Sequence, residues 1–199
     1  SSHKTVAQML CHLACLYFEA DELMASEATF QDALEIYRGV WNQADNKDAC
    51  MMQLTDTLCN VGSIQNRRKR FTQAVASFSE ALDLQLGIVG HDDSRIISTL
   101  DNLGYSYSKL KDYKAALSCY RKMFRAQVSN SGSFTDACLE TFRKQILMFE
   151  KLRRYPEAIE ETKETLLLEK SMLPRDHSII VQTKDLLDEL RHKMRRSES

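Results

Sequence analysis

The sequence repeats a pattern of small and apolar residues at an interval of 42 positions. Gly62 recurs as Gly104, and Ile146 occupies the same position one interval later. A further unit lies upstream, where Ala14 precedes Gly62 by 48 positions. The two central units share the pairs Leu58 and Leu100, Asn60 and Asn102, Ala74 and Ala116, and Phe78 and Tyr120. A period in this range indicates an architecture in which each unit stacks on its neighbours.

Each unit is predicted to be a pair of amphipathic helices joined by a tight turn. Ile96, Leu100, Leu103 and Tyr107 recur at spacings of three and four residues, which places them on one helix face. With only 2 prolines and 6 glycines among 199 residues, the chain lacks the turn residues that a many-stranded sheet needs. We therefore expect an all-α fold, a right-handed α-solenoid of about four helix hairpins in one domain, residues 1–199. The expected hairpins span about 4–46, 47–90, 94–132 and 134–172, and a C-terminal capping helix spans 176–196.

Small residues are expected where the two helices of a hairpin touch. Ala14, Gly62 and Gly104 occupy the first helix, where a larger side chain would push the pair apart. Ala74 and Ala116 supply the matching small surface on the second helix. The repeat interval and the local chemistry of the hairpins therefore agree.

The charge balance argues against nucleic acid as a partner. Lys and Arg number 27 and Asp and Glu number 28, so the formal charge is −1 and no global positive field exists. Two basic runs, at residues 66–70 and 191–196, are predicted to be solvated surface, with nuclear import or phosphate binding as the alternative. Charged residues interrupt every apolar stretch before it reaches the ~20 residues of a membrane-spanning helix, so no membrane insertion is expected.

The six cysteines form no C-x-x-C pair and no zinc-finger spacing, and we expect neither a metal nor another cofactor. Cys11 and Cys15, with His12 beside Cys11, share a helix face and are the one candidate for two metal ligands or a nucleophile. We favour small packing residues with free thiols, which fits an intracellular and most simply cytoplasmic protein. The first residue is not Met, which suggests a domain of a longer protein.

No catalytic motif is present in the sequence. P-loop, nucleophile-elbow, zinc-protease and dinucleotide-binding patterns are all missing, and the five histidines are scattered. His91 and His177 occupy equivalent linkers, which makes them copies of one structural feature. We therefore predict a protein that is not an enzyme.

The repeat units resemble the tetratricopeptide repeat (TPR), whose pattern is W-x2-L-G-x2-Y followed by A-x3-F. Leu103, Gly104 and Tyr107 match the first half of that pattern, and Ala74 with Phe78 matches the second half. The 42-residue period and the linkers at residues 86–93 and 173–177 are similar to those of the kinesin light chain type. Close matches to the family lie between residues 58 and 124.

The resemblance implies a peptide-binding groove along the first helices of the repeats, on the concave side of the solenoid. In that family, the groove asparagine of each repeat, here Asn60 and Asn102, bonds the backbone of an extended peptide, since an amide side chain both donates and accepts. Bonding to neighbouring helices alone is the alternative. The candidate groove residues are Asn60, Ser63, Asn66, Asp101, Asn102, Tyr105, Lys109, Arg143, Lys144 and Leu147.

The functional hypothesis is a non-enzymatic adaptor that binds a short linear peptide or a partner helix in this groove. Lys109, Arg143 and Lys144 are predicted to receive acidic side chains or a terminal carboxylate, and Tyr105 an apolar anchor. Cys11 and His12 stand where chaperone-binding TPR domains carry the first lysine of a two-carboxylate clamp, so an EEVD-type ligand is not expected. The alternative is an assembly or self-association module that acts through convex or terminal-helix surfaces of a larger protein, and homo-oligomers stay open.

Overall fold

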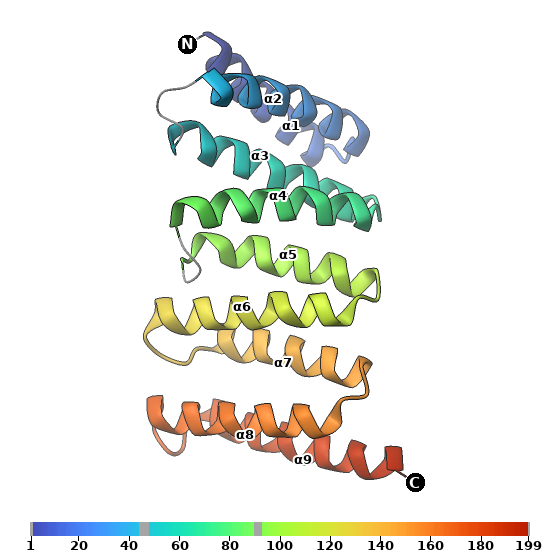
Figure 1. Ribbon diagram of the computed structural model, residues 1–199, viewed down its shortest axis with the longest axis vertical. Coiled ribbons are helices and arrows are strands. Elements are labelled where there is room, and N and C mark those ends of the chain that lie inside the picture. The colour runs from blue at the N-terminus through green and yellow to red at the C-terminus, as the bar shows by residue number, and fades with distance from the viewer. Residues whose placement is uncertain (1, 44–47, 90–92, 199) are drawn as a thin grey trace.

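Figure 1 shows the computed structural model, which describes residues 2–43, 48–89 and 93–198. Within those ranges the only regular secondary structure is helix, which confirms the predicted all-α solenoid. None of the described helices is both long and apolar enough to cross a membrane. The predicted boundary between the first two hairpins, at residues 46 and 47, and the linker residue His91 lie outside the described residues. The helices are α1 (Ser2–Glu19), α2 (Leu23–Gln43), α3 (Asp48–Arg67), α4 (Phe71–Val89), α5 (Arg95–Lys109), α6 (Tyr113–Ser131), α7 (Asp136–Lys151), α8 (Tyr155–Met172) and α9 (Ser178–Glu198).

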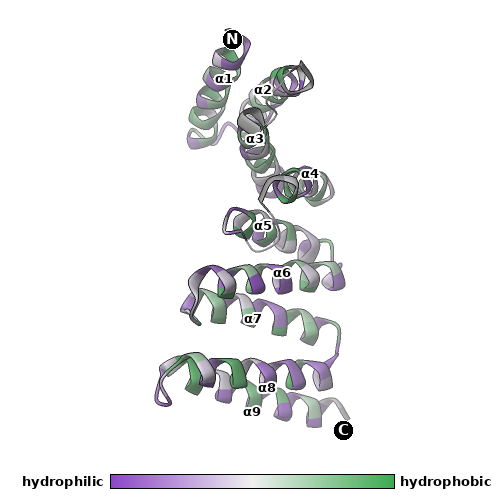
Figure 2. Ribbon diagram, turned by 60° about the vertical axis from the view of Figure 1, so that its left-hand side comes forward, coloured by the Kyte–Doolittle hydropathy of each residue, from purple (hydrophilic) through white to green (hydrophobic). Residues whose placement is uncertain are grey.

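The helices stack one after another along the long axis of the molecule, and the chain termini lie at opposite ends (Figures 1 and 2). Each helix packs against the helices that precede and follow it in the sequence. We call α1, α3, α5 and α7 the first helices, and the surface that they form the first-helix face. The second helices are α2, α4, α6 and α8. Figure 2 shows both apolar and polar stretches on these helices, as expected of elements buried on one side.

The two helices of every hairpin are joined by the same tight turn. Its left-handed residue is Asp21, Lys69, Lys111 or Arg153, with φ between 56° and 62°. In each turn the N–H of the next residue donates to the carbonyl oxygen five residues earlier, at 2.8 to 3.0 Å, which satisfies a helix C-terminal acceptor. These turn residues are 48, 42 and 42 positions apart, the intervals of the sequence repeat. The repeat therefore extends to the backbone of the turns.

Local capping determines where several helices begin. The Asp112 side chain accepts a hydrogen bond from the Ala115 N–H at 3.0 Å, and Thr135 accepts one from the Cys138 N–H at 3.4 Å. Pro156 lies in the first turn of α8, where its missing N–H removes no helical hydrogen bond. Two caps and a first-turn proline thus mark the starts of α6, α7 and α8 in the local sequence.

Close packing inside the two central hairpins depends on glycine. A Cβ atom added to Gly62 would lie 2.8 Å from the ring of Phe78, and one added to Gly104 would lie 2.7 Å from the ring of Tyr120. Both distances are well below van der Waals contact, so an aromatic ring of the second helix fills the space that a side chain would need. The sequence-based expectation of close helix contact at these positions is confirmed.

The fourth hairpin is more open than the others. Ile146 stands at the glycine position of α7, and Thr162 stands in α8 where the central hairpins have an aromatic ring. Both residues are buried. α7 and α8 approach each other less closely than the paired helices of the other hairpins, and α8 packs mainly on α9 (Figure 1). A larger side chain on the first helix keeps the pair apart, as the small-residue argument requires.

The basic run at residues 66–70 is not simply a solvated surface. Arg67 forms an ion pair with Asp21 at 2.7 Å, and both Arg68 and Arg70 pair with Glu27, whose side chain is only 11% exposed. These contacts join α2 and the first turn to the end of α3 and the turn that follows it. Three of the four basic side chains in the run are thereby paired with carboxylates, which disfavours the phosphate-binding alternative.

Candidate functional site

A cleft of about 490 Å³ opens on the first-helix face between α5 and α7. Its walls carry side chains from the two first helices, and one residue of α6 reaches it from behind α5. We call it the α5–α7 cleft. It is lined by Asp101, Asn102, Tyr105, Ser108, Lys109, Tyr120, Lys144, Leu147 and Met148. Six of these are candidate groove residues from the sequence: Asp101, Asn102, Tyr105, Lys109, Lys144 and Leu147.

Two apolar side chains are presented to solvent at this cleft. Tyr105 is 43% exposed and Leu147 is 45% exposed, although both sit on helices that bury most of their other large apolar residues. The ring of Phe71 meets the Tyr105 ring edge to face, with 6.3 Å between centroids, which restricts how the tyrosine moves. The cleft therefore offers an ordered aromatic ring and an aliphatic side chain as contact points for an apolar group.

The charges of the cleft leave one cation in excess. The Lys144 Nζ donates to Asp101 Oδ1 at 2.7 Å across the cleft, so these two charges balance. The Lys109 Nζ lies 5.0 Å from the centroid of the Tyr105 ring and has no carboxylate partner among the described residues. Burial, with the nearby Asp101 carboxylate, raises the pKa of Tyr120, so this phenol stays neutral. The cleft thus favours an anionic group near Lys109.

Asn102 is only half engaged by the protein. Its side-chain Nδ2 donates to the carbonyl oxygen of Ser98 at 3.0 Å, one helical turn earlier. Among the described residues nothing donates to its Oδ1, which leaves that oxygen as an acceptor for a ligand N–H. The donor half of the amide is therefore occupied in this structure.

A second, smaller cleft of about 320 Å³ lies between α1 and α3. Asn60 and Asp56 of α3 line it, together with His12 of α1 and Tyr37 of α2. Burial raises the pKa of the Asp56 carboxyl. The buried Gln53 Oε1, also in this wall, accepts no hydrogen bond in the part of the chain that is described. Asn60 and Asn102 therefore lie in two different clefts of the same face.

The remaining candidates are committed to contacts within the protein. Ser63 donates to the Cys59 carbonyl oxygen at 2.8 Å, and Asn66 Oδ1 accepts from the Ser106 hydroxyl of α5 at 2.9 Å. Arg143 donates to Gln182 Oε1 of α9 at 2.9 Å. The structure thus gathers six of the ten candidates at one cleft and places Asn60, Ser63, Asn66 and Arg143 elsewhere.

Three residues of the α5–α7 cleft were not among the sequence candidates: Ser108, Tyr120 and Met148. Tyr120 belongs to a second helix, and its position matches the aromatic residue of the A-x3-F pattern. It lines the cleft because Gly104 has no side chain to cover its ring. Gly104 is the sequence signal for this contact. Because glycine has no side chain, an aromatic ring packed against it can reach the far side of the helix that carries the glycine.

Cys11 is half-buried and Cys15 is exposed on α1. No group of metal-ligating side chains that could hold an ion is present in the described ranges. The Cys11 Sγ contacts Thr57 Oγ1 at 3.5 Å, and Cys59 repeats this contact with Thr99 at 3.4 Å, so both thiols pack between successive first helices. These contacts support the packing interpretation for Cys11 and Cys59, whereas Cys15 is exposed.

Cys15 is expected to react slowly, although it is exposed. Burial, followed by the neighbouring Cys11 and Glu19, raises the pKa of its thiol, so less thiolate is present near neutral pH than in a free cysteine. We expect alkylation by iodoacetamide to be slower than that of a small-molecule thiol and to accelerate as the pH rises. Mass spectrometry of the labelled peptide measures the alkylation rate of Cys15, with Cys15→Ser as the blank. A rate above that of the free thiol would contradict this prediction.

Comparison with known proteins agrees with the helix hairpins described above. Residues 53–127 match the family model of the tetratricopeptide repeat. This segment contains most of α3, all of α4 and α5 and most of α6. No curated protein matches the chain. The matched segment includes the α5 wall of the α5–α7 cleft, whereas the α7 wall lies beyond it.

Solved structures show the same fold over the whole chain. A putative kinesin light chain from P. anserina with nearly identical TPR-like repeats is 11% identical, with a TM-score of 0.70, covering 100% of this chain and 92% of that one. BtubC (BKLC) from P. vanneervenii is 13% identical, with a TM-score of 0.67 and coverage of 98% and 77%. A tetratricopeptide repeat protein from Parabacteroides merdae is 17% identical, with a TM-score of 0.61 and coverage of 95% and 61%. At these identities the likeness concerns the fold.

Proposed function

Because the chain carries tetratricopeptide repeats and has the fold of a TPR solenoid throughout, we propose that it is a non-enzymatic adaptor that binds a linear peptide of a partner protein. TPR proteins generally mediate protein–protein interactions and are generally non-enzymatic scaffolds. We place the peptide on the first-helix face, in the α5–α7 cleft. The observation that carries the proposal is the gathering, at that cleft, of two exposed apolar side chains and a lysine that has no carboxylate partner among the described residues.

The chemistry of the cleft defines the peptide. Lys109 supplies the one cation without a carboxylate partner among the described residues of the cleft, so the ligand carries an acidic side chain or a terminal carboxylate at that point. Tyr105 and Leu147 contact an apolar side chain next to it. Asn102 Oδ1 accepts from a main-chain N–H of an extended peptide. An acidic residue adjacent to an apolar one, in an extended segment, satisfies all three features.

Selection from a random peptide library displayed on phage tests this proposal. We expect the wild-type chain to enrich peptides with an acidic residue beside an apolar residue. Lys109→Glu should lower the affinity for the enriched peptides by about tenfold or more, because a charge-assisted hydrogen bond is replaced by repulsion. Fluorescence polarisation of the labelled peptides measures the change.

Lys122→Glu is the matched control, since it makes the same charge change at an exposed site of α6, away from the cleft. Its binding should stay within about twofold of the wild type. Enrichment of the same peptides by Lys109→Glu, or no enrichment by the wild type, would count against the cleft as the binding site. An equal loss of peptide affinity in Lys109→Glu and Lys122→Glu would show that net charge, and not the cleft, determines binding.

A further inference from the structure

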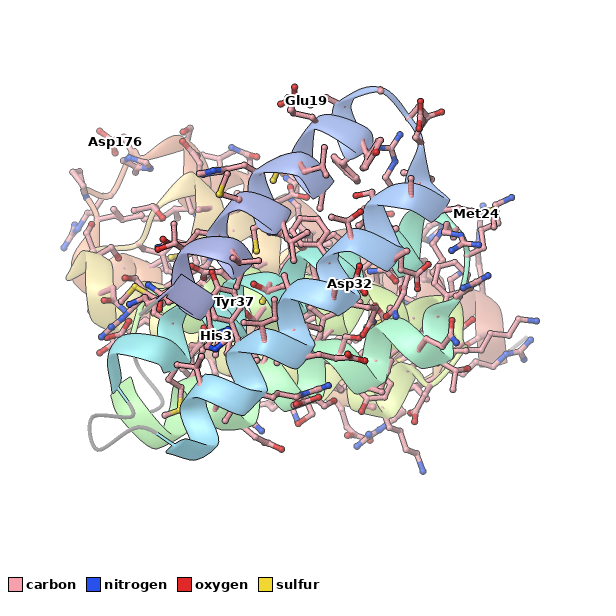
Figure 3. The ribbon with its side chains drawn as sticks, turned by 90° about the horizontal axis from the view of Figure 1, so that it is seen from above. His3, Glu19, Met24, Asp32, Tyr37 and Asp176 are labelled. Carbon is pink, nitrogen blue, oxygen red and sulfur yellow. The ribbon has the colours of Figure 1, made fainter. Side chains whose placement is uncertain are left out.

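The smaller cleft of the first-helix face, about 320 Å³ between α1 and α3, differs in charge from the α5–α7 cleft. We call it the α1–α3 cleft. Its walls include Asp56 and Asn60 of α3, Gln8 and His12 of α1, and Tyr37 of α2. No Lys or Arg is among the described residues that line it. Figure 3 views the molecule from above, where α1 and α2 form the layer nearest the viewer and Tyr37 is labelled.

The carboxylate of this cleft is not neutralised within the protein. Asp56 has neither an ion pair nor a hydrogen bond to its side chain among the described residues. Burial raises the pKa of its carboxyl, and no described cation offsets that effect. In the α5–α7 cleft, by contrast, Asp101 accepts from the Lys144 Nζ at 2.7 Å. The α1–α3 cleft therefore has one anion in excess, whereas the α5–α7 cleft has one cation in excess.

Acceptor atoms in the wall of the α1–α3 cleft also lack donors. Gln53 Oε1 is buried in this wall and accepts no hydrogen bond from the described residues. The Thr57 hydroxyl donates to the Gln53 carbonyl oxygen at 2.6 Å, so its proton is already used. The exposed Asn60 amide has no described partner, and its Oδ1 is open to a donor. A positively charged group with several N–H donors complements this wall, and a guanidinium or an ammonium group has both properties.

We propose that the α1–α3 cleft binds the side chain of an arginine or a lysine in the peptide whose acidic residue lies near Lys109. The Asp56 carboxylate accepts from this side chain, and Asn60 Oδ1 accepts a second N–H. The inference rests on the proposed function, because it places a second part of the same peptide. Both clefts lie on the first-helix face, so an extended peptide that crosses α3 and α5 enters both.

The repeat sets the distance between the two charges of the peptide. Two steps between successive first helices separate the clefts, and packed helices lie about 10 Å apart, so the separation is roughly 20 Å. The direct contacts between α3 and α5 agree with close packing of the first helices. An extended peptide advances about 3.3 Å per residue, so about six residues cover this separation. We therefore expect a basic residue about six positions from the acidic one.

The peptides that the wild-type chain enriches from the phage library test this expectation. An arginine or a lysine should recur at a constant distance of about six positions from the acidic residue. Replacing that basic residue of an enriched peptide with glutamate should lower the affinity about tenfold in fluorescence polarisation. Enriched peptides with the acidic and apolar residues but no basic residue overturn this inference and leave the proposed function intact. No enrichment at all overturns both.

Charge reversal in the protein assigns the basic residue to the α1–α3 cleft. Asp56→Lys should bind the glutamate form of the peptide more tightly than the basic form, and Asp56→Asn should bind the two forms about equally. Asp83→Lys is the matched control, because it makes the same charge change at an exposed site of α4 and should keep the wild-type preference. Circular dichroism checks that each variant is folded. An Asp56→Lys protein that still prefers the basic form, or a reversed preference in Asp83→Lys, contradicts the proposed site.

Discussion

Replacing Glu169 with glutamine should stabilise the protein above neutral pH. Glu169 of α8 is fully buried, and only one of its carboxylate oxygens is bonded, by the Thr183 hydroxyl of α9 at 2.7 Å. The other oxygen, Oε2, accepts no hydrogen bond from the described residues. Burial raises the pKa of this carboxyl from 4.5 to about 7, because a charge there is taken out of water without a cation beside it.

The sign of the pH dependence follows from the proton that the folded state retains. Between the unfolded pKa of 4.5 and the folded pKa of about 7, the folded chain holds a proton that the unfolded chain has lost. The contribution of this carboxyl to the free energy of unfolding is therefore fully present below pH 4.5. It falls as the pH rises from 4.5 to about 7 and is lost above that pH. A shift of this size corresponds to roughly 3 kcal/mol. Glu169→Gln should gain about that much near pH 8 and little near pH 5.

Chemical denaturation followed by circular dichroism at several pH values measures the difference between the two proteins. Glu164→Gln is the control, because it removes an exposed carboxylate of the same helix. We expect that control to parallel the wild type within ~0.5 kcal/mol at every pH. If the free energies of unfolding of the wild type and Glu169→Gln change with pH in parallel, the buried carboxyl does not have the pH-dependent effect that we predict.

The helices follow from the sequence because their signals are local and repeated. The recurring Gly62 and Gly104, with Ala74 and Ala116, specify helix pairs that pack closely, and the Asp112 and Thr135 caps fix where helices start. Such signals need no knowledge of distant residues. This is why the fold class could be predicted from composition, periodicity and small-residue spacing.

The candidate site was predictable only in part, because cleft formation depends on which side chains the protein has already used. Helical phase placed Tyr105 and Leu147 on the first-helix face, and the structure brings both to one cleft. Phase could not show that Arg143 is bonded to Gln182 of α9, or that Asn66 is bonded to Ser106 of α5. Those contacts join residues about 40 positions apart in sequence, and only the stacked structure reveals them.

Replacing Gly104 with isoleucine should strongly destabilise the protein. The nearest atom to an added Cβ belongs to the Tyr120 ring at 2.7 Å, and Tyr120 is buried in the core, so the ring has to shift to make room. An overpacked core of this kind costs about 3 kcal/mol or more. Thermal and chemical denaturation measure the loss, and a variant within ~1 kcal/mol of the wild type would contradict it.

The fourth hairpin supplies the compensating change. There Ile146 faces a helix that carries Thr162 at the position of Tyr120, and the hairpin folds with both residues buried. Adding Tyr120→Thr to Gly104→Ile recreates that pair in the third hairpin and removes the ring that clashes. We expect the double variant to recover at least half of the lost stability, whereas Tyr120→Thr alone destabilises because it leaves a cavity beside glycine. A double variant as unstable as the sum of the single changes would mean that the two positions do not determine helix spacing as a pair, and that the open fourth hairpin has another cause.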